Sequence, residues 1–293
     1  MPELPEVETI RRHLAPHVEG RTLERLVIHD ARWTLPLMPA EVSSAVEGRE
    51  VETLGRRGKY LVWELEDEVY LMLHLRMTGT LLLDPPERPP HTRVTFDLGE
   101  HTLEFVDPRR FGTGELALGP EALDDFFAKR LGVEPFDAEF TGEHLYELTQ
   151  HSRAPIKAML LDQKRIAGVG NIYADEALFR AQVHPLRRAD QLTRKQCEAV
   201  RDGVVASLQA GIEAKGATID DFRHPDGVSG TFQDRFLIHL REDEPCVRCG
   251  RAVRKLRAAG RGTYVCEKCQ PRPRYAASAR SASAPSRSAR TSS

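Results

Sequence analysis

Residues 246–269 read CVRCGRAVRKLRAAGRGTYVCEKC, and this stretch holds four of the five cysteines in the chain. The cysteines form two CxxC pairs, Cys246 with Cys249 and Cys266 with Cys269, separated by sixteen residues. Such spacing is typical of four thiolates around one tetrahedral zinc ion, and a closed site of this kind stabilises a fold and does not catalyse. The stretch therefore predicts a β-hairpin held together by one structural Zn²⁺.

Cationic side chains crowd the same stretch. Residues 246–293 contain twelve Lys or Arg and one Glu, a net charge of +11. Because the whole chain carries −2, residues 1–245 carry −13. An acidic body argues against general binding of polyanions, whereas a basic end fits a local contact with a phosphate backbone. We therefore expect the hairpin to face nucleic acid.

Length and composition indicate two domains with a small appendage, since 293 residues exceed one ordinary domain and 40% of them are hydrophobic. The start, MPELPEVETIRRHL, lacks the basic cluster and apolar run of a secretory signal, and eighteen consecutive apolar residues occur nowhere. We expect a soluble, cytoplasmic protein with no membrane contact. The fifth cysteine, Cys197, lies on an apolar stripe of helical spacing and is expected to be a buried helix residue.

The first part of the chain is expected to be a β-sandwich preceded by a short helix. From Pro5, the spacing of Val7, Ile10 and Leu14 predicts one apolar helix face. Val, Leu, Thr and aromatic residues then alternate in part around 22–33, 51–65, 68–83, 92–98 and 101–106, which predicts strands.

After Gly119 the periodicity becomes helical. Helices are predicted over 120–132, 142–150, 156–163, 171–181 and 194–215. AGVGN at 167–171 supplies glycines for a tight turn that exposes backbone N–H groups. Residues 217–235 are expected to form a mobile loop and residues 271–293 a disordered basic tail.

Six blocks of the sequence carry a resemblance to a known family. They are PELPEVE at 2–8, RRGKYL at 56–61, LRMTG at 75–79, DPRRFG at 107–112, AGVGNIYADEALF at 167–179 and GRGTYVCEKCQ at 260–270. In this order they resemble the formamidopyrimidine-DNA glycosylase (Fpg) family. The resemblance implies an α+β protein with a catalytic β-sandwich domain at 1–119, a helix–two-turn–helix DNA-binding domain at 120–235 and a zinc-finger hairpin at 236–270.

The resemblance also implies a bifunctional DNA glycosylase and abasic-site lyase of base excision repair. Removal of Met1 would leave Pro2 as a secondary amine, and an α-amino group, with a pKa of about 7.7–8.0, is easily deprotonated for attack on a sugar carbon. By resemblance, Pro2 forms the Schiff base, Glu3 is the acid catalyst, Lys59 serves β-elimination and Arg261 serves δ-elimination. Glu6 is the second carboxylate of the motif, and stabilisation of the helix N-terminus is an equal alternative for it.

A glycosylase extrudes its target base and must fill the gap that the base leaves. By resemblance, Met77, Arg109 and Phe111 form the inserted wedge, although Met77 and Phe111 could instead be ordinary core residues. The resemblance assigns contacts with the DNA backbone to five further polar residues, for which a solvated surface position is the alternative. These are His91, Arg110, Arg153, Lys157 and Asn171.

Three places depart from the family pattern. IHLREDE at 238–244 stands where a Tyr-Gly pair and a basic–acidic–Gly run are usual, so the approach to the hairpin is expected to differ in backbone geometry. Arg153 replaces a common lysine and keeps the charge. KGATI at 215–219 only partly resembles the loop that covers the lesion, which bears on lesion preference.

Two other functions fit parts of the pattern. One is the sister endonuclease VIII branch, which prefers oxidised pyrimidines. The other is a non-catalytic lesion-binding or architectural protein on the same scaffold, against which Pro2, Glu3 and Lys59 argue. We favour an enzyme that acts as a monomer on double-stranded DNA containing 8-oxoguanine, formamidopyrimidines or abasic sites.

Overall fold

The computed structural model describes residues 2–218 and 230–273. The predicted mobile loop at 217–235 and the predicted tail at 271–293 therefore lie largely outside the described residues. Within the described part of the chain, no helix is both long and apolar enough to cross a membrane.

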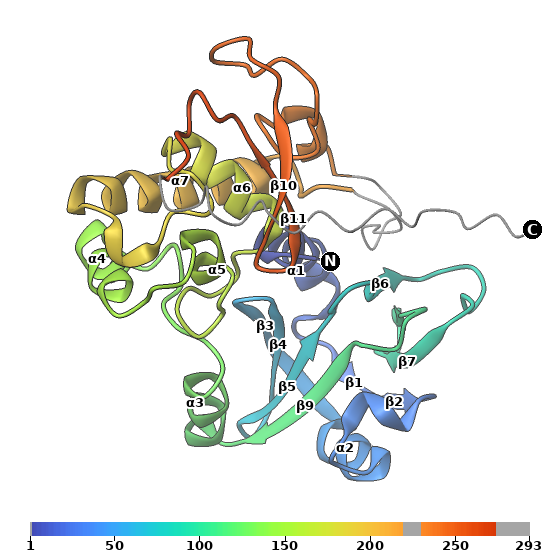
Figure 1. Cartoon of the computed structure of the whole chain (residues 1–293). Coiled ribbons are helices and arrows are strands. Elements are labelled where there is room, and N and C mark those ends of the chain that lie inside the picture. Colours follow the sequence, from blue (N-terminus) through green and yellow to red (C-terminus); the bar gives the residue numbers. More distant parts are fainter. Residues whose placement is uncertain (1, 219–229, 274–293) are drawn as a thin grey trace, which may run out of the picture.

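The N-terminal part is a sandwich of two antiparallel sheets (Figure 1). A five-stranded sheet has the order β1-β3-β4-β5-β9 and a four-stranded sheet the order β2-β7-β8-β6. The strands are β1 (Thr22–Leu23), β2 (Arg25–Ile28), β3 (Arg49–Arg57), β4 (Tyr60–Leu65), β5 (Val69–His74), β6 (Thr80–Leu83), β7 (Thr92–Asp97), β8 (Thr102–Val106) and β9 (Thr113–Leu118). Trp63 of one sheet stacks on Phe96 of the other at 5.1 Å between ring centres, which joins the layers.

The predicted stretches contain strands, but 22–33, 51–65 and 68–83 each hold two of them. The structure differs in three further places. The segment 22–33 ends in a 3₁₀ helix, η1 (Ala31–Thr34), because the Asp30 carboxylate accepts a hydrogen bond from the Arg32 N–H. Helix α2 (Pro39–Val46) and strand β9 were not predicted. In β9, Gly114 obscures the strand pattern but is needed, since a Cβ there would lie 2.2 Å from the Trp33 ring.

The five predicted helices of the second part are confirmed. They are α3 (Pro120–Ala128), α4 (Gly142–Gln150), α5 (Ile156–Leu160), α6 (Asn171–Arg180) and α7 (Arg194–Glu213), with short 3₁₀ turns η2 (Ala189–Gln191) and η3 (Phe232–Arg235). Cys197 is fully buried in α7, as its apolar stripe predicts. Secondary structure changes from strand to helix between Leu118 and Pro120.

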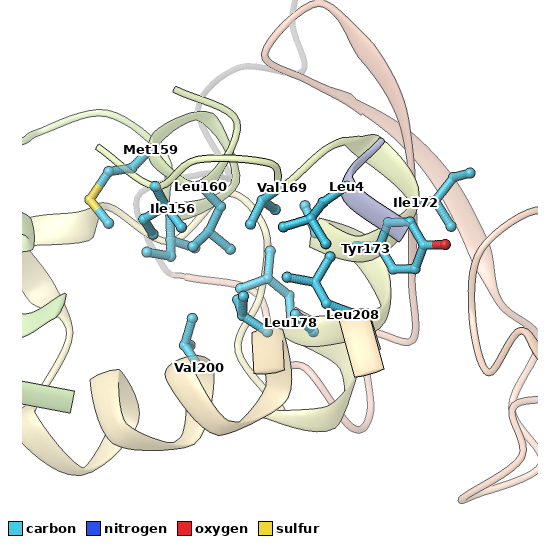
Figure 2. Packing of buried hydrophobic residues seen from close by; sticks show 14 of the residues in the cluster. Leu4, Ile156, Met159, Leu160, Val169, Ile172, Tyr173, Leu178, Val200 and Leu208 are labelled. Atoms are coloured by element: carbon cyan, nitrogen blue, oxygen red, sulfur yellow. The ribbon is translucent and has the colours of Figure 1, made fainter. Parts of the chain in front are cut away.

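Helix α1 (Leu4–Val18) joins the two halves of the molecule. Its first residue, Leu4, packs in the core of the helical part beside Val169 and Leu208, as Figure 2 shows. Farther along the helix, Val7 and Ile10 belong to the core of the sandwich. The N-terminus consequently lies between the two halves (Figure 1), which is where both can contribute to a site.

The C-terminal hairpin consists of β10 (Arg254–Ala258) and β11 (Arg261–Val265). Its Val253 and Cys266 pack with Phe179 of α6, so the hairpin rests on the helical part. Before the hairpin, Leu240 (φ 57°) and Asp243 (φ 63°) adopt the left-handed conformation that favours glycine. These two strained positions fall within IHLREDE, the segment expected to have a distinct backbone geometry.

Candidate functional site

Glu3 lies where the N-terminal segment meets helix α6. Its carboxylate accepts hydrogen bonds from the backbone N–H groups of Ile172 (3.2 Å) and Tyr173 (3.5 Å) in the first turn of α6. Gly170 provides the space, because a Cβ there would lie 2.0 Å from the carboxyl carbon of Glu3. Unpaired N–H groups at a helix N-terminus attract an anion. The glycine-rich turn before α6 thus fixes the carboxylate that neighbours Pro2 in the chain.

Glu6 is buried beneath Glu3. It accepts hydrogen bonds of 2.8 Å from the backbone N–H of Glu3, the hydroxyl of Tyr173 and the backbone N–H of Ala217. Burial raises the pKa of Glu6, and the negative charge of Glu3 acts in the same direction. The Glu6 carboxylate therefore ties the start of α1 to α6 and to the chain that follows α7.

Lys59 enters the same region from the sandwich, at the turn between β3 and β4. Its side chain is buried, and Nζ donates to the carbonyl of Val169 at 3.0 Å. Burial lowers the pKa of Lys59, with the positive charge of Arg261 adding to the effect and the charges of Glu3 and Glu6 opposing it. The structure thus brings the predicted residues Glu3, Glu6, Lys59 and Arg261 within electrostatic reach of one another.

The sequence reasoning missed one residue that shapes this region, Gln163. Its side-chain amide donates to the carbonyl of Val169 at 2.9 Å and accepts from the N–H of Gly168 at 3.0 Å. Gln163 therefore holds the turn that bears the Lys59 contact. In the sequence, Gln163 is noticeable only as the last residue of a predicted helix. That position does not predict a contact with a distant part of the chain.

Arg261 is exposed at the start of β11, beside the turn of the hairpin. The next residue, Gly262, accepts a hydrogen bond at 3.2 Å from the amide of Asn171 at the start of α6. The hairpin tip and the N-terminus of α6 therefore meet, which places Arg261 at the edge of the region that contains Glu3 and Lys59.

Lys157, predicted to contact the DNA backbone, is enclosed by protein with 0% of its surface exposed. Its ammonium donates to Asp175 and to the hydroxyl of Thr263, both at 2.7 Å. Asp175 also accepts from His239 at 2.8 Å. A phosphate could reach this ammonium only if these bonds broke. In the structure these bonds join the hairpin to α5 and α6, and the contact of Lys157 with the DNA backbone stays a prediction.

The predicted wedge residues lie on two loops of the sandwich. Met77 follows β5, and Arg109 and Phe111 lie between β8 and β9. Met77 is 37% exposed and Phe111 is 49% exposed, so neither is an ordinary core residue. The guanidinium of Arg109 lies 4.8 Å from the centre of the Phe111 ring. Arg109 and Phe111 are thus in contact on one loop, and exposed Met77 lies on the other loop, which Thr78 bonds to Asp107 of the first.

Three of the predicted backbone contacts are exposed cations or potential cations. His91 and Arg153 are exposed, the latter just before α5. Arg110 is exposed as well, and its Nε donates to the buried carboxylate of Asp30 at 2.6 Å. Each of these side chains presents a donor at the surface, which a phosphate contact requires.

The four cysteines of the hairpin form a metal site. Their Sγ atoms all lie within 4.8 Å of one another. Four thiolates without a fifth ligand match the donor set of a structural zinc ion, with no position left for a substrate. Cys246, Cys249, Cys266 and Cys269 are thus positioned to bind one structural Zn²⁺, as predicted.

Three family models match successive parts of the chain. They are the formamidopyrimidine-DNA glycosylase N-terminal domain at residues 1–114, the formamidopyrimidine-DNA glycosylase H2TH domain at residues 131–223 and the zinc finger found in FPG and IleRS at residues 243–272. The matches follow the order of sandwich, helices and hairpin in the structure. The predicted α+β fold class and the resemblance on which it rests are thereby confirmed.

Similar proteins and similar solved structures point to the same family as the family models. Formamidopyrimidine-DNA glycosylase of Bacillus licheniformis is 40% identical over 277 residues, covering 92% of this chain and 99% of the relative. The crystal structure of MutM (Fpg) from Thermus thermophilus has a TM-score of 0.84 at 42% identity, covering 92% of this chain and 98% of that one. Lactococcus lactis Fpg bound to abasic-site DNA has a TM-score of 0.85 at 34% identity, covering 92% and 100%. The chain belongs to the formamidopyrimidine-DNA glycosylase family.

Proposed function

We propose that this chain is a bifunctional DNA glycosylase and abasic-site lyase that excises oxidised purines from double-stranded DNA, with Pro2 as the nucleophile. The observation that supports it best is that Lys59 and the N-terminus of α6 both interact with Glu3, the residue next to Pro2 in the chain. The substrate class is supported by structures of a Lactococcus lactis Fpg mutant with DNA containing Fapy-dG and of Lactococcus lactis Fpg with abasic-site DNA. The wild-type Lactococcus lactis protein has also been crystallised with DNA containing an oxidised pyrimidine. All these groups come from one chain, so we propose a monomer.

The chemistry starts when Met1 has been removed. The secondary amine of Pro2 attacks the sugar C1′, the C1′–N bond breaks, and the damaged base leaves with its bonding electrons. The Pro2 nitrogen loses its proton, the C1′–O4′ bond breaks to open the sugar, and an iminium forms between Pro2 and C1′. Glu3 supplies the proton that the departing base or the ring oxygen O4′ takes up. The resulting iminium makes the C2′ proton acidic. Lys59, whose pKa burial lowers, is suited to take up that proton in β-elimination. Arg261 would then bind the remaining phosphate during δ-elimination.

The decisive experiment is borohydride trapping on a duplex with 8-oxoguanine opposite cytosine. The wild-type protein should become covalently attached to the DNA, and Pro2→Gly should lose most of this product. Pro86→Gly, a substitution at an exposed proline, is the matched control and should trap normally. Intact-mass analysis of the wild type should show loss of Met1. A fully active protein that retains Met1 would rule out Pro2 as the nucleophile.

A parallel excision assay distinguishes this proposal from its two alternatives. Duplexes carrying 8-oxoguanine or thymine glycol are compared at equal enzyme concentration. A preference for thymine glycol would assign the chain to the endonuclease VIII type of activity. Binding of both duplexes without excision or trapping would instead identify a non-catalytic lesion-binding protein.

A further inference from the structure

Asp107 is a buried carboxylate that joins the two loops bearing Met77 and Phe111. It is 0% exposed and follows strand β8. One carboxylate oxygen, Oδ1, accepts from the hydroxyl of Thr78 and from the N–H of Arg109. The other, Oδ2, accepts from the N–H groups of Phe111 at 2.8 Å and Gly112 at 2.7 Å. A single side chain thus satisfies four donors from two loops that are about thirty residues apart in sequence.

The backbone of Asp107 adds a third segment to this cluster. Its N–H donates to the carbonyl of His91 at 3.1 Å, and its carbonyl accepts from Nε of Arg93 at 2.8 Å. The three DNA-facing stretches predicted from the sequence, around residues 77, 91 and 110, are therefore all bonded to this one residue.

Each of the same three stretches contains a non-glycine residue with positive φ. Arg76 (φ 55°), His91 (φ 68°) and Arg110 (φ 60°) all hold the left-handed conformation, although none is a glycine. Such a conformation is unfavourable for a residue with a Cβ and persists where the surrounding contacts hold it in place. Asp107 bonds the backbone of two of the three, because its N–H donates to the carbonyl of His91 and its carbonyl accepts from the N–H of Arg110 at 3.3 Å.

The ring of Phe105 lies against the backbone of both loops, at Gly79 and at Gly112. A Cβ on Gly79 would lie 2.9 Å from the Phe105 ring, and a Cβ on Gly112 would lie 2.4 Å from it. Each loop therefore packs its backbone directly on the same buried ring. Asp107 and Phe105 together leave the loops little freedom to move independently.

We propose that Asp107 is a positioning residue that holds Met77, Arg109 and Phe111 as one preassembled wedge before DNA binds. The proposal rests on the proposed function, in which this wedge fills the gap left by the extruded base. A preassembled wedge saves the entropy of ordering two loops at the moment of base extrusion. Asp107 is buried and bonds only to protein groups in the described part of the chain, so its effect should be confined to the steps that need the wedge.

The test compares two duplexes in single-turnover excision. In one duplex, 8-oxoguanine pairs with cytosine. In the other, it lies opposite a tetrahydrofuran abasic site, so the wedge has no partner base to separate from the lesion or to bind. Asp107→Asn presents an amide NH₂ to two of the four donors. Excision opposite cytosine should slow by roughly 100-fold, which is the size of effect that misplacement by about 1 Å causes. Excision opposite the abasic site should slow far less.

Thr78→Val provides a second variant that removes only the bond between the loops. It leaves the backbone bonds of Asp107 intact and should reduce excision opposite cytosine by roughly tenfold, while Thr78→Ser should retain wild-type activity. Asp84→Asn is the matched control, since this carboxylate accepts from the N–H of Thr102 at 2.7 Å and is bonded to neither loop. It should excise both substrates normally.

Equal losses on both duplexes for folded Asp107→Asn and Thr78→Val would overturn the proposal, as would the absence of any loss. Failure of the proposed function has a different signature, because the wild type itself would then fail to excise 8-oxoguanine. Met77→Ala identifies the wedge independently and should also impair excision opposite cytosine selectively.

Discussion

His74 shows how the environment of one residue makes stability depend on pH. Burial lowers its pKa to about 3, and the positive charges of Arg76 and Lys59 act in the same direction. In the unfolded chain a histidine titrates near its ordinary pKa of about 6.5. Below that pH the unfolded state therefore binds a proton that the folded state rejects. The contribution of neutral His74 is fully present above pH 6.5 and is lost as the pH falls from 6.5 toward 3.

We expect this single group to reduce the free energy of unfolding by about 2 kcal/mol between pH 7 and pH 5. Urea unfolding measures the free energy of unfolding at both pH values. Between pH 7 and pH 5, His74→Gln should lose about 2 kcal/mol less of this free energy than the wild type does. His151→Gln, at an exposed histidine, should keep the wild-type dependence. If His74→Gln and the wild type lose the same free energy, His74 is not the group responsible.

At the scale of elements, the contact between α6 and α7 depends on a glycine. A Cβ on Gly203 of α7 would lie 2.5 Å from the carbonyl oxygen of Ala177 in α6. Alanine is the better helix former by about 1 kcal/mol, yet here it would force the two helices apart. The steric cost of overpacking, typically about 1–3 kcal/mol, should prevail.

Gly203→Ala is therefore expected to lower the free energy of unfolding despite its gain in helix propensity. Chemical denaturation monitored by circular dichroism measures the change. Asp202→Ala, at the adjacent exposed position of α7, should alter stability by no more than about 0.5 kcal/mol. A stabilised Gly203→Ala would show that α6 can shift to accommodate the methyl group.

At the scale of the whole molecule, the zinc-binding hairpin is joined to the helical part through Lys157, Asp175 and Thr263. Cys249→Ser should release zinc, loosen the hairpin and remove the cations around Arg261 from the DNA-facing surface. DNA affinity should fall roughly tenfold or more, with a shallower salt dependence, because fewer phosphates are neutralised. The sandwich should remain folded, since its core is separate.

A metal-indicator assay and fluorescence anisotropy at several salt concentrations measure the two effects of Cys249→Ser. Cys197→Ser is the matched control, because Cys197 lies in α7 and is not one of the four clustered thiols. It should retain zinc. Unchanged DNA affinity for zinc-free Cys249→Ser at equal salt would remove the hairpin from the DNA-binding surface.

Local patterns in the sequence determined much of this protein. Helical periodicity located α3 to α7, and cysteine spacing identified the zinc ligands, because these features depend on residues close together in the chain. The six motifs together identified the family. Strand β9 was not predicted because Gly114 interrupts its pattern. The glycine is required there by the ring of Trp33, about eighty residues away in the chain.

Only the tertiary structure decided what surrounds each motif residue. Lys157 looked like a surface cation, and its burial depends on Asp175 and Thr263, which no local pattern connects to it. Likewise, Asp107 is one acid among many until folding brings four donors to it. A side chain's type follows from the sequence, whereas its desolvation and hydrogen-bond partners come from segments distant in the chain, and these set its charge state and its role.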